Sequence, residues 1–479
     1  MYFVHIAFFT CPAYALCGDA VMQRTITKKL LSWKEDPDKK PLIVHGARQI
    51  GKTHSIMEFG MDNYSSVAYF YFDNNPELCG LFESGISSVA SLMTRLEANI
   101  NQDIIPGKTL IFFDEIQSCP AALASLKRFH ETAPEYHIIA AGSLLGVALN
   151  RNAQNRKENE KDRKVYAYPV GKADELSMFP FSFEEFLMEF NPKLIPLIQE
   201  SFDGDAVMPP GLHEQALGLF LQYLAIGGMP EAILEYGKTK NYIQVRAKQL
   251  SICGGYARDM NKYTETKAQA VRNEAVYDTL PSQLARENKK FQYALIKSGA
   301  RANDYELSLN WLEKAGMIIK CSKVNEGKEP LANYEDFLSF KAYVSDVGLL
   351  AAKSNNSHIS ILGRTMGERA RGAMTENFVA QELKANGIKA YYWESGNEAE
   401  VDFVIQLGNA VIPIEVKSGE DVRSKSLEAF RNRYGIANAV RISARNFGFD
   451  NGIKSVPLYA AWCIRPGAAG LAKLTGKEF

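Results

Sequence analysis

Short, nearly continuous apolar runs alternate with helical stretches in the first third of the chain. The runs lie at residues 42–45, 67–73, 109–114 and 136–142. A run of this kind is typical of a strand that is buried on both faces of a parallel sheet. Parallel strands need long crossovers, and the helical stretches between the runs supply them. The pattern therefore predicts an α/β fold built on a doubly wound sheet.

Helical spacing replaces this pattern in the middle of the chain. Pro180 ends an extended stretch, and Ser182 with Glu185 predicts a capping box at the start of a new helix. We therefore expect the first domain to cover residues 22–190. Apolar residues then recur at helical spacing over 191–265, which we interpret as a helical lid.

Residues 266–335 combine helices with a following strand. A helix is predicted by a stripe of apolar positions at i, i+4 and i+7, which are Tyr305, Leu309 and Leu312. Gly316 is placed to end this helix, and an apolar run continues as a strand, so we predict a winged-helix-like module. The outer positions of the helix carry three acids, Asp304, Glu306 and Glu313. A role of this helix in packing or in binding a protein is therefore at least as good an interpretation as sequence-specific DNA binding.

Residues 336–479 predict a second α/β domain. A helix over 374–387, which Gly387 ends, precedes three strands, a further helix and a further strand. The strands are expected at 389–395, 401–406 and 411–418, the later helix at 424–434 and the last strand at 438–443.

Composition narrows the classes of protein. The chain has 479 residues, 46 % of them hydrophobic, so it can bury a core, and its length suggests about three domains. Because 55 Lys and Arg balance 55 Asp and Glu, any nucleic-acid site must be local. The seven cysteines show no CxxC and no metal-ligand spacing. This argues against disulfides and a zinc site and favours a reducing, cytoplasmic location.

No stretch approaches the roughly 18 consecutive apolar residues of a transmembrane helix, so we expect no membrane partner. Residues 1–21 are apolar, but no Lys or Arg precedes the apolar run as in a secretory signal. We interpret them as an extension outside the fold, with Met22 as the start. Residues 151–164 carry six basic and three acidic residues. We interpret them as a solvated loop, with contact to DNA phosphate or a partner as the alternative.

A phosphate-binding loop joins the first predicted strand to a helix. Residues 46–53 read Gly-x-x-x-x-Gly-Lys-Thr. The glycines let the backbone curl its N–H groups around phosphate oxygens, and the helix presents its positive N-terminus. We expect Lys52 to reach the β and γ phosphates of ATP and the Thr53 hydroxyl to coordinate Mg²⁺. The predicted nucleotide contacts in this segment are Gly46, Arg48, Gln49, Ile50, Gly51, Lys52, Thr53 and His54.

A second segment supports the same site independently. The apolar run at 109–114 ends in Asp114 and is followed by Glu115, as expected where a central parallel strand meets its ligand. We expect Asp114 to hold Mg²⁺ through water and Glu115 to deprotonate the attacking water. Ser143 follows another strand and is a candidate sensor of the γ-phosphate, with a turn serine as the equal alternative. No arginine finger can be identified from the sequence.

Carboxylates in the last domain form a second candidate site. Glu376 lies on a helix, Asp402 begins a strand, and Glu415 and Lys417 share one face of the next strand. We predict that Asp402 and Glu415 hold Mg²⁺ or Mn²⁺ and that Lys417 positions water or steadies the charge on phosphate. This is the chemistry of phosphodiester hydrolysis on a restriction-endonuclease-like frame. The alternative is a strand cap at Asp402 and a solvated strand edge.

From Met22 onward the chain resembles a bacterial and archaeal family of AAA-type ATPases with a C-terminal domain of unknown function. The resemblance rests on GARQIGKT, IFFDEIQ, AAGSLLG, FPFSFEEF, GGMPEAI, KAYVSDVGLL, TENFVAQEL, EVDFVIQ and IEVKSG. It implies a P-loop ATPase followed by a domain similar to PD-(D/E)XK nucleases, although Val401 stands where that signature usually has proline. The resemblance implies nucleotide roles for Gly51, Lys52, Thr53, Asp114 and Glu115, and nuclease roles for Glu376, Asp402, Glu415 and Lys417.

Two functions fit these features. In the first, hydrolysis of ATP with Mg²⁺ controls a nuclease domain that acts on DNA, which the intact carboxylate set favours. In the second, the chain is an ATP-dependent switch whose last domain binds nucleic acid or protein without cleavage, which the neutral net charge favours. The expected partners are ATP, DNA and, by analogy with other P-loop ATPases, a second copy of the chain.

Overall fold

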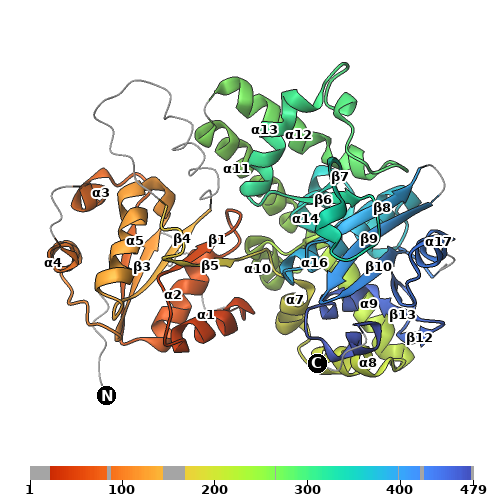
Figure 1. The fold of residues 1–479 in the computed structure, drawn as a ribbon, viewed down its shortest axis with the longest axis horizontal. Helices are drawn as coiled ribbons and strands as arrows, with labels where there is room; N and C mark the ends of the chain where they lie inside the picture. Colours follow the sequence, from red (N-terminus) through yellow and green to blue (C-terminus); the bar gives the residue numbers. More distant parts are fainter. Residues whose placement is uncertain are drawn as a thin grey trace. The chain divides into compact units, whose positions relative to one another are not determined.

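The computed structural model describes residues 22–83, 88–143, 168–264, 266–396, 399–420 and 425–475. The chain divides into two compact units, with the boundary between Met178 and Phe179 (Figure 1). The predictions for residues 1–21 and 151–164 lie outside the described residues.

A five-stranded parallel sheet is the centre of the first unit. Its strands are β1 (Leu42–His45), β2 (Ser66–Tyr71), β3 (Thr109–Asp114), β4 (His137–Gly142) and β5 (Asp174–Ser177). They follow the order β2-β3-β4-β1-β5, and every neighbouring pair is parallel. The four predicted strands are confirmed. The sequence did not indicate β5, because this edge strand alternates half-buried with exposed residues and has no apolar run.

Helices cover both faces of this sheet, which confirms the doubly wound arrangement. Gly60 of α2 (Lys52–Asn63) lies against Val67 and Leu110. The alternate residues of the same strands, Ala68 and Ile111, face a core that they share with α3, α4 and α5. The other helices are α1 (Ile26–Glu35), α3 (Pro76–Glu83), α4 (Val89–Ile100) and α5 (Pro120–Thr132), with the 3-10 turn η1 (Ile116–Ser118).

An eight-stranded mixed sheet is the centre of the second unit, in the order β12-β13-β11-β10-β9-β8-β6-β7. Its strands are β6 (Ile318–Val324), β7 (Glu335–Val344), β8 (Tyr391–Ser395), β9 (Ala399–Leu407), β10 (Ala410–Val416), β11 (Ala439–Ser443), β12 (Gly448–Asp450) and β13 (Ile453–Pro457). Its α-helices are α7 (Phe183–Phe190), α8 (Leu194–Gly204), α9 (Pro210–Ile226), α10 (Pro230–Thr239), α11 (Tyr242–Tyr263), α12 (Lys267–Leu284), α13 (Ala302–Lys314), α14 (Val347–Lys353), α15 (His358–Leu362), α16 (Glu368–Ala385), α17 (Lys425–Tyr434) and α18 (Ala472–Thr475). The short 3-10 turns are η3 (Tyr293–Leu295), η4 (Leu331–Tyr334), η5 (Leu458–Cys463) and η6 (Ala469–Leu471).

The helix and strand order expected near the C-terminus is confirmed. Helix α16 is followed by β8, β9 and β10, then by α17 and β11. Helix α16 begins earlier than the expected residue 374, at Glu368. It ends before Gly387, which has a φ of +73°. The N–H of the next residue, Ile388, donates to the Leu383 carbonyl oxygen at 2.9 Å and closes the last turn.

The expected domain boundaries differ from the division that the structure makes. Helix α7 belongs to the second unit because Phe183 packs its ring against Phe220, Tyr223 and Phe378. The first unit therefore ends at Met178, before the expected residue 190.

Residues 266–335 are joined to the last domain by a shared sheet. Strand β6 pairs with β7 on one side and with β8 on the other. Buried Tyr305, Leu309 and Leu312 confirm the predicted apolar stripe of α13. The helices and the β6–β7 pair thus pack as part of the second unit, and no boundary at residue 335 separates them from it.

No single helix among the described residues is long and apolar enough to span a membrane. Helices α9 and α10 reach that length and composition only as a pair that is bent by 118°.

Candidate functional site

The phosphate-binding loop follows β1 and curls before α2. Gly46, Gln49 and Gly51 all have positive φ, at 156°, 64° and 91°. A Cβ on Gly46 would lie 2.2 Å from the Met178 carbonyl oxygen and 2.7 Å from Ile50 Cδ1. Glycine is therefore required at position 46 for close packing as well as for backbone freedom. The resulting concave backbone is the geometry that binds anions.

Lys52 lies buried inside this loop. Its Nζ donates to the carbonyl oxygens of Gly46 at 3.0 Å and of Ala47 at 2.7 Å. Burial lowers the pKa of Lys52 to about 8, against the opposing effect of the nearby Glu115 and Asp114 carboxylates. The ammonium group is thus desolvated and held by loop carbonyls that phosphate oxygens can replace.

Asp114 ends β3 and is tied to the loop. Its Oδ2 accepts hydrogen bonds from Thr53 Oγ1 at 2.8 Å and from the Tyr69 hydroxyl at 3.0 Å. Its Oδ1 accepts from the Glu115 N–H at 3.0 Å. Burial raises the pKa of Asp114, while the bonds from Thr53 and Tyr69 oppose the rise. The sequence did not indicate Tyr69, whose only signal is its place on β2, the strand next to β3.

Glu115 turns away from the strand in a left-handed conformation, with φ of +53°. Its carboxylate accepts from the Gln117 amide, and Ser143 Oγ lies 3.4 Å from both carboxylate oxygens. Arg48 Nη2 is 3.9 Å from Glu115 Oε2. The structure thus brings together three predicted residues, Arg48, Glu115 and Ser143, and adds Gln117, for which the sequence held no signal.

The other predicted nucleotide contacts lie in different surroundings. Ile50 is fully buried, and its carbonyl oxygen accepts from Arg24 Nη1 at 2.9 Å. His54 lies along α2, with Nδ1 3.9 Å from Glu58. Arg24, which precedes α1, is a further residue that the sequence did not single out.

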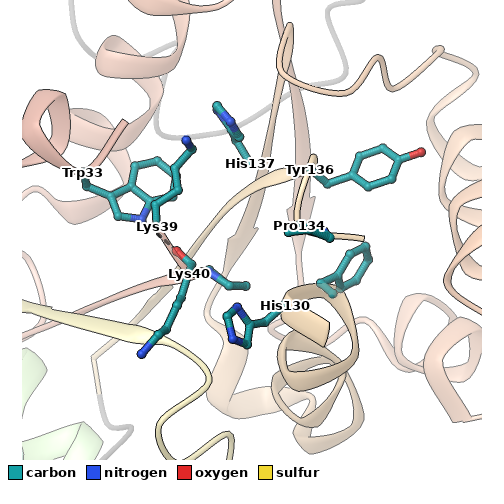
Figure 2. A pocket seen from close by; sticks show the side chains of 9 residues that line it. Trp33, Lys39, Lys40, His130, Pro134, Tyr136 and His137 are labelled. Atoms are coloured by element: carbon teal, nitrogen blue, oxygen red, sulfur yellow. Dashed lines mark hydrogen bonds between the residues drawn. The ribbon is translucent and has the colours of Figure 1, made fainter. Parts of the chain in front are cut away.

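A hollow at the opposite edge of the sheet is distinct from this site. Figure 2 shows Trp33, Lys40, His130 and His137 around it, at the amino ends of β1 and β4. With a free volume of about 10 Å³, it has room for about one water molecule. It is therefore too small to hold a nucleotide.

Glu376 of α16 is the centre of a second buried cluster, in the second unit. Its Oε1 accepts from Lys341 Nζ at 3.1 Å and from the Tyr343 hydroxyl at 2.5 Å, and its Oε2 accepts from Lys289. Burial alone would raise the pKa of Glu376, but Lys289 and Lys341 outweigh it and hold the pKa at about 2. Lys341 also lies 2.5 Å from Glu400 Oε1. The two lysines were not indicated by the sequence.

Asp402 and Glu415 complete this cluster. Asp402 Oδ2 accepts from the Val416 N–H at 2.8 Å, and Lys417 Nζ contacts Glu415 Oε1 at 2.6 Å. Burial, Glu376 and Glu415 raise the pKa of Asp402 to about 8. Glu415 is buried, and its Oε2 has no hydrogen-bond partner within the described chain. All four predicted residues therefore lie in one neighbourhood.

The oxygen atoms of the two sites show how well each could hold the expected metal ion. Within the described ranges no three His, Cys, Asp or Glu side chains gather into a group that could hold a metal. Thr53 with Asp114 offers one hydroxyl and one carboxylate at 2.8 Å from each other, a pair that suits Mg²⁺ when phosphate completes the oxygen shell. In the second unit, the unpartnered Glu415 Oε2 is an atom that a cation would satisfy.

Three segments of the chain match known protein families. Residues 38–187 match an AAA domain family, residues 217–359 match a domain of unknown function, DUF8612, and residues 371–461 match another, DUF4143. No curated protein matches the chain.

Three solved structures are among those that resemble this chain. The Walker-type ATPase PABY2304 of Pyrococcus abyssi has 14 % identity and a TM-score of 0.40, over 70 % of this chain and 96 % of that one. The ORC1 protein of Aeropyrum pernix, solved in complex with DNA, has 12 % identity and a TM-score of 0.27, over 73 % and 96 %. PCH-2 of C. elegans has 11 % identity and a TM-score of 0.25, over 47 % and 68 %.

The family match coincides with the site built above. Residues 38–187 contain the loop at 46–53, the strand that ends in Asp114, and Ser143. A parallel five-stranded sheet with a phosphate-binding loop after β1 is the fold of P-loop NTPases. Residues 38–187 therefore combine the match to an AAA domain family with the strand order and loop of a P-loop NTPase fold.

Proposed function

We propose that the first unit hydrolyses ATP with Mg²⁺ and that this cycle controls the second unit, whose carboxylate cluster cleaves phosphodiesters of DNA. The observation that carries the ATPase part is the pairing of Thr53 with Asp114 next to the Lys52 loop, with Glu115 beside them. These are the groups that phosphoryl transfer needs: phosphate donors, a metal-holding pair and a carboxylate for water.

Each residue has one role in the proposed hydrolysis. The loop N–H groups and Lys52 bind the phosphates, and Thr53 and Asp114 hold the metal. Bound Mg²⁺ neutralises charge on the phosphate oxygens. Glu115 accepts the proton of the attacking water, and Ser143, at 3.4 Å from that carboxylate, orients it.

Substitution of Lys52 tests the ATPase site. Lys52→Ala should lose ATP hydrolysis, because the desolvated ammonium inside the loop is the group that reaches the phosphates. Lys28→Ala, an exposed lysine of α1, is the matched control and should hydrolyse ATP as the unaltered chain does. If a folded Lys52→Ala protein still hydrolyses ATP, the assignment of this loop as the ATPase site is wrong.

A continuous segment offers the route for control of the second unit. In the first unit, Met178 N–H donates to His45 O at 2.8 Å, and the Met178 carbonyl packs against Gly46. A few residues later, in the second unit, Phe183 N–H donates to Glu382 Oε1 at 2.9 Å. Glu382 lies on α16, the helix that carries Glu376. A shift of the loop on nucleotide binding is therefore passed along this segment to α16.

Hydrogen exchange measures this coupling without reference to cleavage. Mg²⁺ with ATP should change the exchange protection of α16 in the unaltered chain and leave it unchanged in Lys52→Ala. Insertion of Gly-Ser between Met178 and Phe179 should keep ATP hydrolysis and abolish the change in α16. Equal protection with and without ATP in the unaltered chain would contradict the coupling.

The proposed cleavage depends on Asp402 and Glu415. Together they would hold a divalent cation, and Lys417, which contacts Glu415, would position the attacking water. Linear, nicked, branched and single-stranded DNA should be tested in Mg²⁺ and in Mn²⁺, with and without ATP. Asp402→Asn should abolish cleavage, whereas Asp450→Asn on the exposed strand β12 should not.

A switch without cleavage is the second candidate, and one observation favours it. Lys289 and Lys341 already neutralise Glu376, so this carboxylate is held by cations of the protein itself. If no DNA is cut while ATP hydrolysis and the exchange change of α16 persist, the second unit is a binding platform. Binding of the chain to the same linear, nicked, branched and single-stranded DNA should then be measured, to test whether DNA is the partner of the second unit.

A further inference from the structure

Lys289 brings a positive charge from an exposed turn into the buried carboxylate cluster of the second unit. It lies between α12 and η3, and residues 286–288, which precede it, are exposed. Its Nζ donates to Glu376 Oε2, and the Lys289 side chain is 18 % exposed while that of Glu376 is 3 % exposed. The cation that covers this oxygen of Glu376 is therefore carried by a segment at the surface.

The two oxygens of Glu376 have different partners. Oε1 accepts from Lys341 Nζ at 3.1 Å and from the Tyr343 hydroxyl at 2.5 Å, and both of these donors are fully buried on β7. Oε2 accepts from Lys289, which lies outside the sheet. Loss of Lys289 would thus free Oε2 for another cation, while Lys341 and Tyr343 still hold the carboxylate.

Lys341 joins Glu376 to the strand that carries Asp402. Its Nζ lies 2.5 Å from Glu400 Oε1 as well as 3.1 Å from Glu376 Oε1. Glu400 and Asp402 are alternate residues of β9, so their side chains are on the same face of the sheet. Glu376 therefore faces the side of β9 on which Asp402 lies.

Glu415 belongs to the same face. Strands β9 and β10 are antiparallel with Phe403 opposite Ile414, so the adjoining residues Asp402 and Glu415 are opposite each other. Residues in such positions have Cβ atoms about 4.5–5.5 Å apart. Glu415 Oε2 has no hydrogen-bond partner among the residues that the structure describes. The sheet thus holds two carboxylates beside the one that Lys289 covers.

Charge balance decides how strongly this cluster attracts a metal ion. When all groups are ionised, four carboxylates carry one charge more than the three lysines that contact members of the cluster. The carboxylates are those of Glu376, Glu400, Asp402 and Glu415, and the lysines are Lys289, Lys341 and Lys417. Without Lys289 the excess is two negative charges, which one Mg²⁺ or Mn²⁺ ion would balance. Oxygen sites bind such ions more tightly as their negative charge rises.

We propose that Lys289 is an inhibitory residue whose ammonium group occupies the cation position at Glu376. A divalent metal ion binds there, with Asp402 and Glu415, when residues 285–290 move away. This regulation rests on the carboxylate site proposed above for cleavage. It accounts for the finding that no three metal-binding side chains gather among the described residues while Lys289 is in place.

Binding of Mn²⁺ to the full chain without nucleotide tests this proposal, with the electron paramagnetic resonance signal of free Mn²⁺ as the readout. Lys289→Met keeps the apolar stem and removes the charge, so we expect it to bind Mn²⁺ about tenfold more tightly than the unaltered chain does. Lys289→Arg keeps a cation and should bind Mn²⁺ as the unaltered chain does. Lys290→Met, one residue further on, is the matched control and should also show no gain. Addition of Asp402→Asn to Lys289→Met should abolish the gain.

Lys289→Gln is a second neutral variant, whose amide can still donate to Glu376, and it replaces Lys289→Met if that variant does not fold. The proposal is overturned if the folded neutral variants bind Mn²⁺ no more tightly than the unaltered chain. It is equally overturned if Lys290→Met or the variant with Asp402→Asn shows the same gain.

The measurement needs neither ATP nor DNA, so its failure is separate from failure of the proposed cleavage. A gain in Mn²⁺ affinity without cleavage of DNA by any variant refutes the cleavage and supports the competition between Lys289 and the metal ion. Cleavage that depends on Asp402, with equal Mn²⁺ affinities for the unaltered chain and Lys289→Met, supports the cleavage and refutes the inhibitory role.

Discussion

Asp114 shows how much of this site depends on single hydrogen bonds. The carboxylate is buried, which on its own would favour the neutral form, yet metal binding needs the charged form. Thr53, Tyr69 and the Glu115 N–H all donate to it and favour the charge. In the proposed site the Thr53 hydroxyl would turn to the metal ion, which leaves Tyr69 as the side chain that orients the Asp114 carboxylate.

Tyr69→Phe should therefore weaken binding of ATP in Mg²⁺ several-fold. Binding of ATP in excess EDTA should not change, because the Tyr69 hydroxyl acts on Asp114, whose proposed role is to hold the metal ion. Equilibrium titration with a fluorescent ATP analogue measures both affinities. Tyr71→Phe, an exposed tyrosine of the same strand, is the control. Equal losses with and without Mg²⁺ would assign Tyr69 a purely structural role.

Glu382 predicts a pH dependence of stability in the second unit. Burial raises its pKa from 4.5 to about 8, and Glu185 and Glu184 of α7 add to the rise, against the Phe183 N–H bond that lowers it. A carboxyl whose pKa is higher in the folded chain stabilises the fold below pH 4.5. This stabilisation is lost as the pH rises through about 8.

Glu382→Gln keeps an oxygen for the Phe183 N–H and removes the charge. The variant should match the unaltered chain near pH 4.5 and exceed its free energy of unfolding by on the order of 4 kcal/mol at pH 9. Urea unfolding at a series of pH values, followed by the tryptophans of the second unit, measures the difference. A difference that is constant with pH would contradict a raised pKa. Buried Tyr223 and Asp346, which face the same region, are unchanged in both proteins.

At the scale of elements, glycines decide how closely two helix ends meet. The break after α9 at Gly227 packs against Gly348 in α14, where a Cβ would lie 2.5 Å from Ile226 O and 2.6 Å from Gly227 Cα. Asp346 Oδ2 accepts from the Gly228 N–H at 2.5 Å and fixes the same contact. The motifs GGMPEAI and KAYVSDVGLL thus meet in one junction.

Gly348→Ala should destabilise the second unit by about 2 to 4 kcal/mol, because the backbones must separate to admit the methyl group. Gly237→Ala is the matched control: Gly237 lies in α10 with nothing within 4 Å of a Cβ. It should be neutral or stabilising by up to about 1 kcal/mol, since alanine is the better helix former. Denaturant midpoints of the two variants give the comparison, and equal midpoints would contradict the close contact.

At the scale of the whole molecule, the proposed nucleotide site lies entirely in the first unit, so nucleotide should stabilise an isolated first unit and leave an isolated second unit unchanged. Trp33 is the only tryptophan of residues 22–178, while Trp311, Trp393 and Trp462 belong to the second unit. ATP with Mg²⁺ at about 100 times its Kd should stabilise the first unit by about 2.7 kcal/mol. Fluorescence of the isolated fragments 22–178 and 179–475 during thermal unfolding measures this. A nucleotide-dependent shift in the second fragment would place a nucleotide site there.

Local patterns were enough to predict strands β1 to β4 and the phosphate loop. Strands β1 to β4 are nearly continuous apolar runs, and the Gly46 to Thr53 spacing encodes backbone geometry directly. Helix ends at Ser182 and Gly387 were likewise predictable, because capping depends on residues within one turn. These features need no knowledge of what packs against them.

What the sequence by itself determined was therefore the type of many elements, among them β1 to β4, and the phosphate-binding loop at 46–53. Only the tertiary structure decided which distant groups meet. Tyr69 reaches Asp114 from a neighbouring strand, and Lys289 and Lys341 reach Glu376 from separate segments. Such contacts join residues far apart in the chain, and burial, which sets their charge, depends on every element that packs around them.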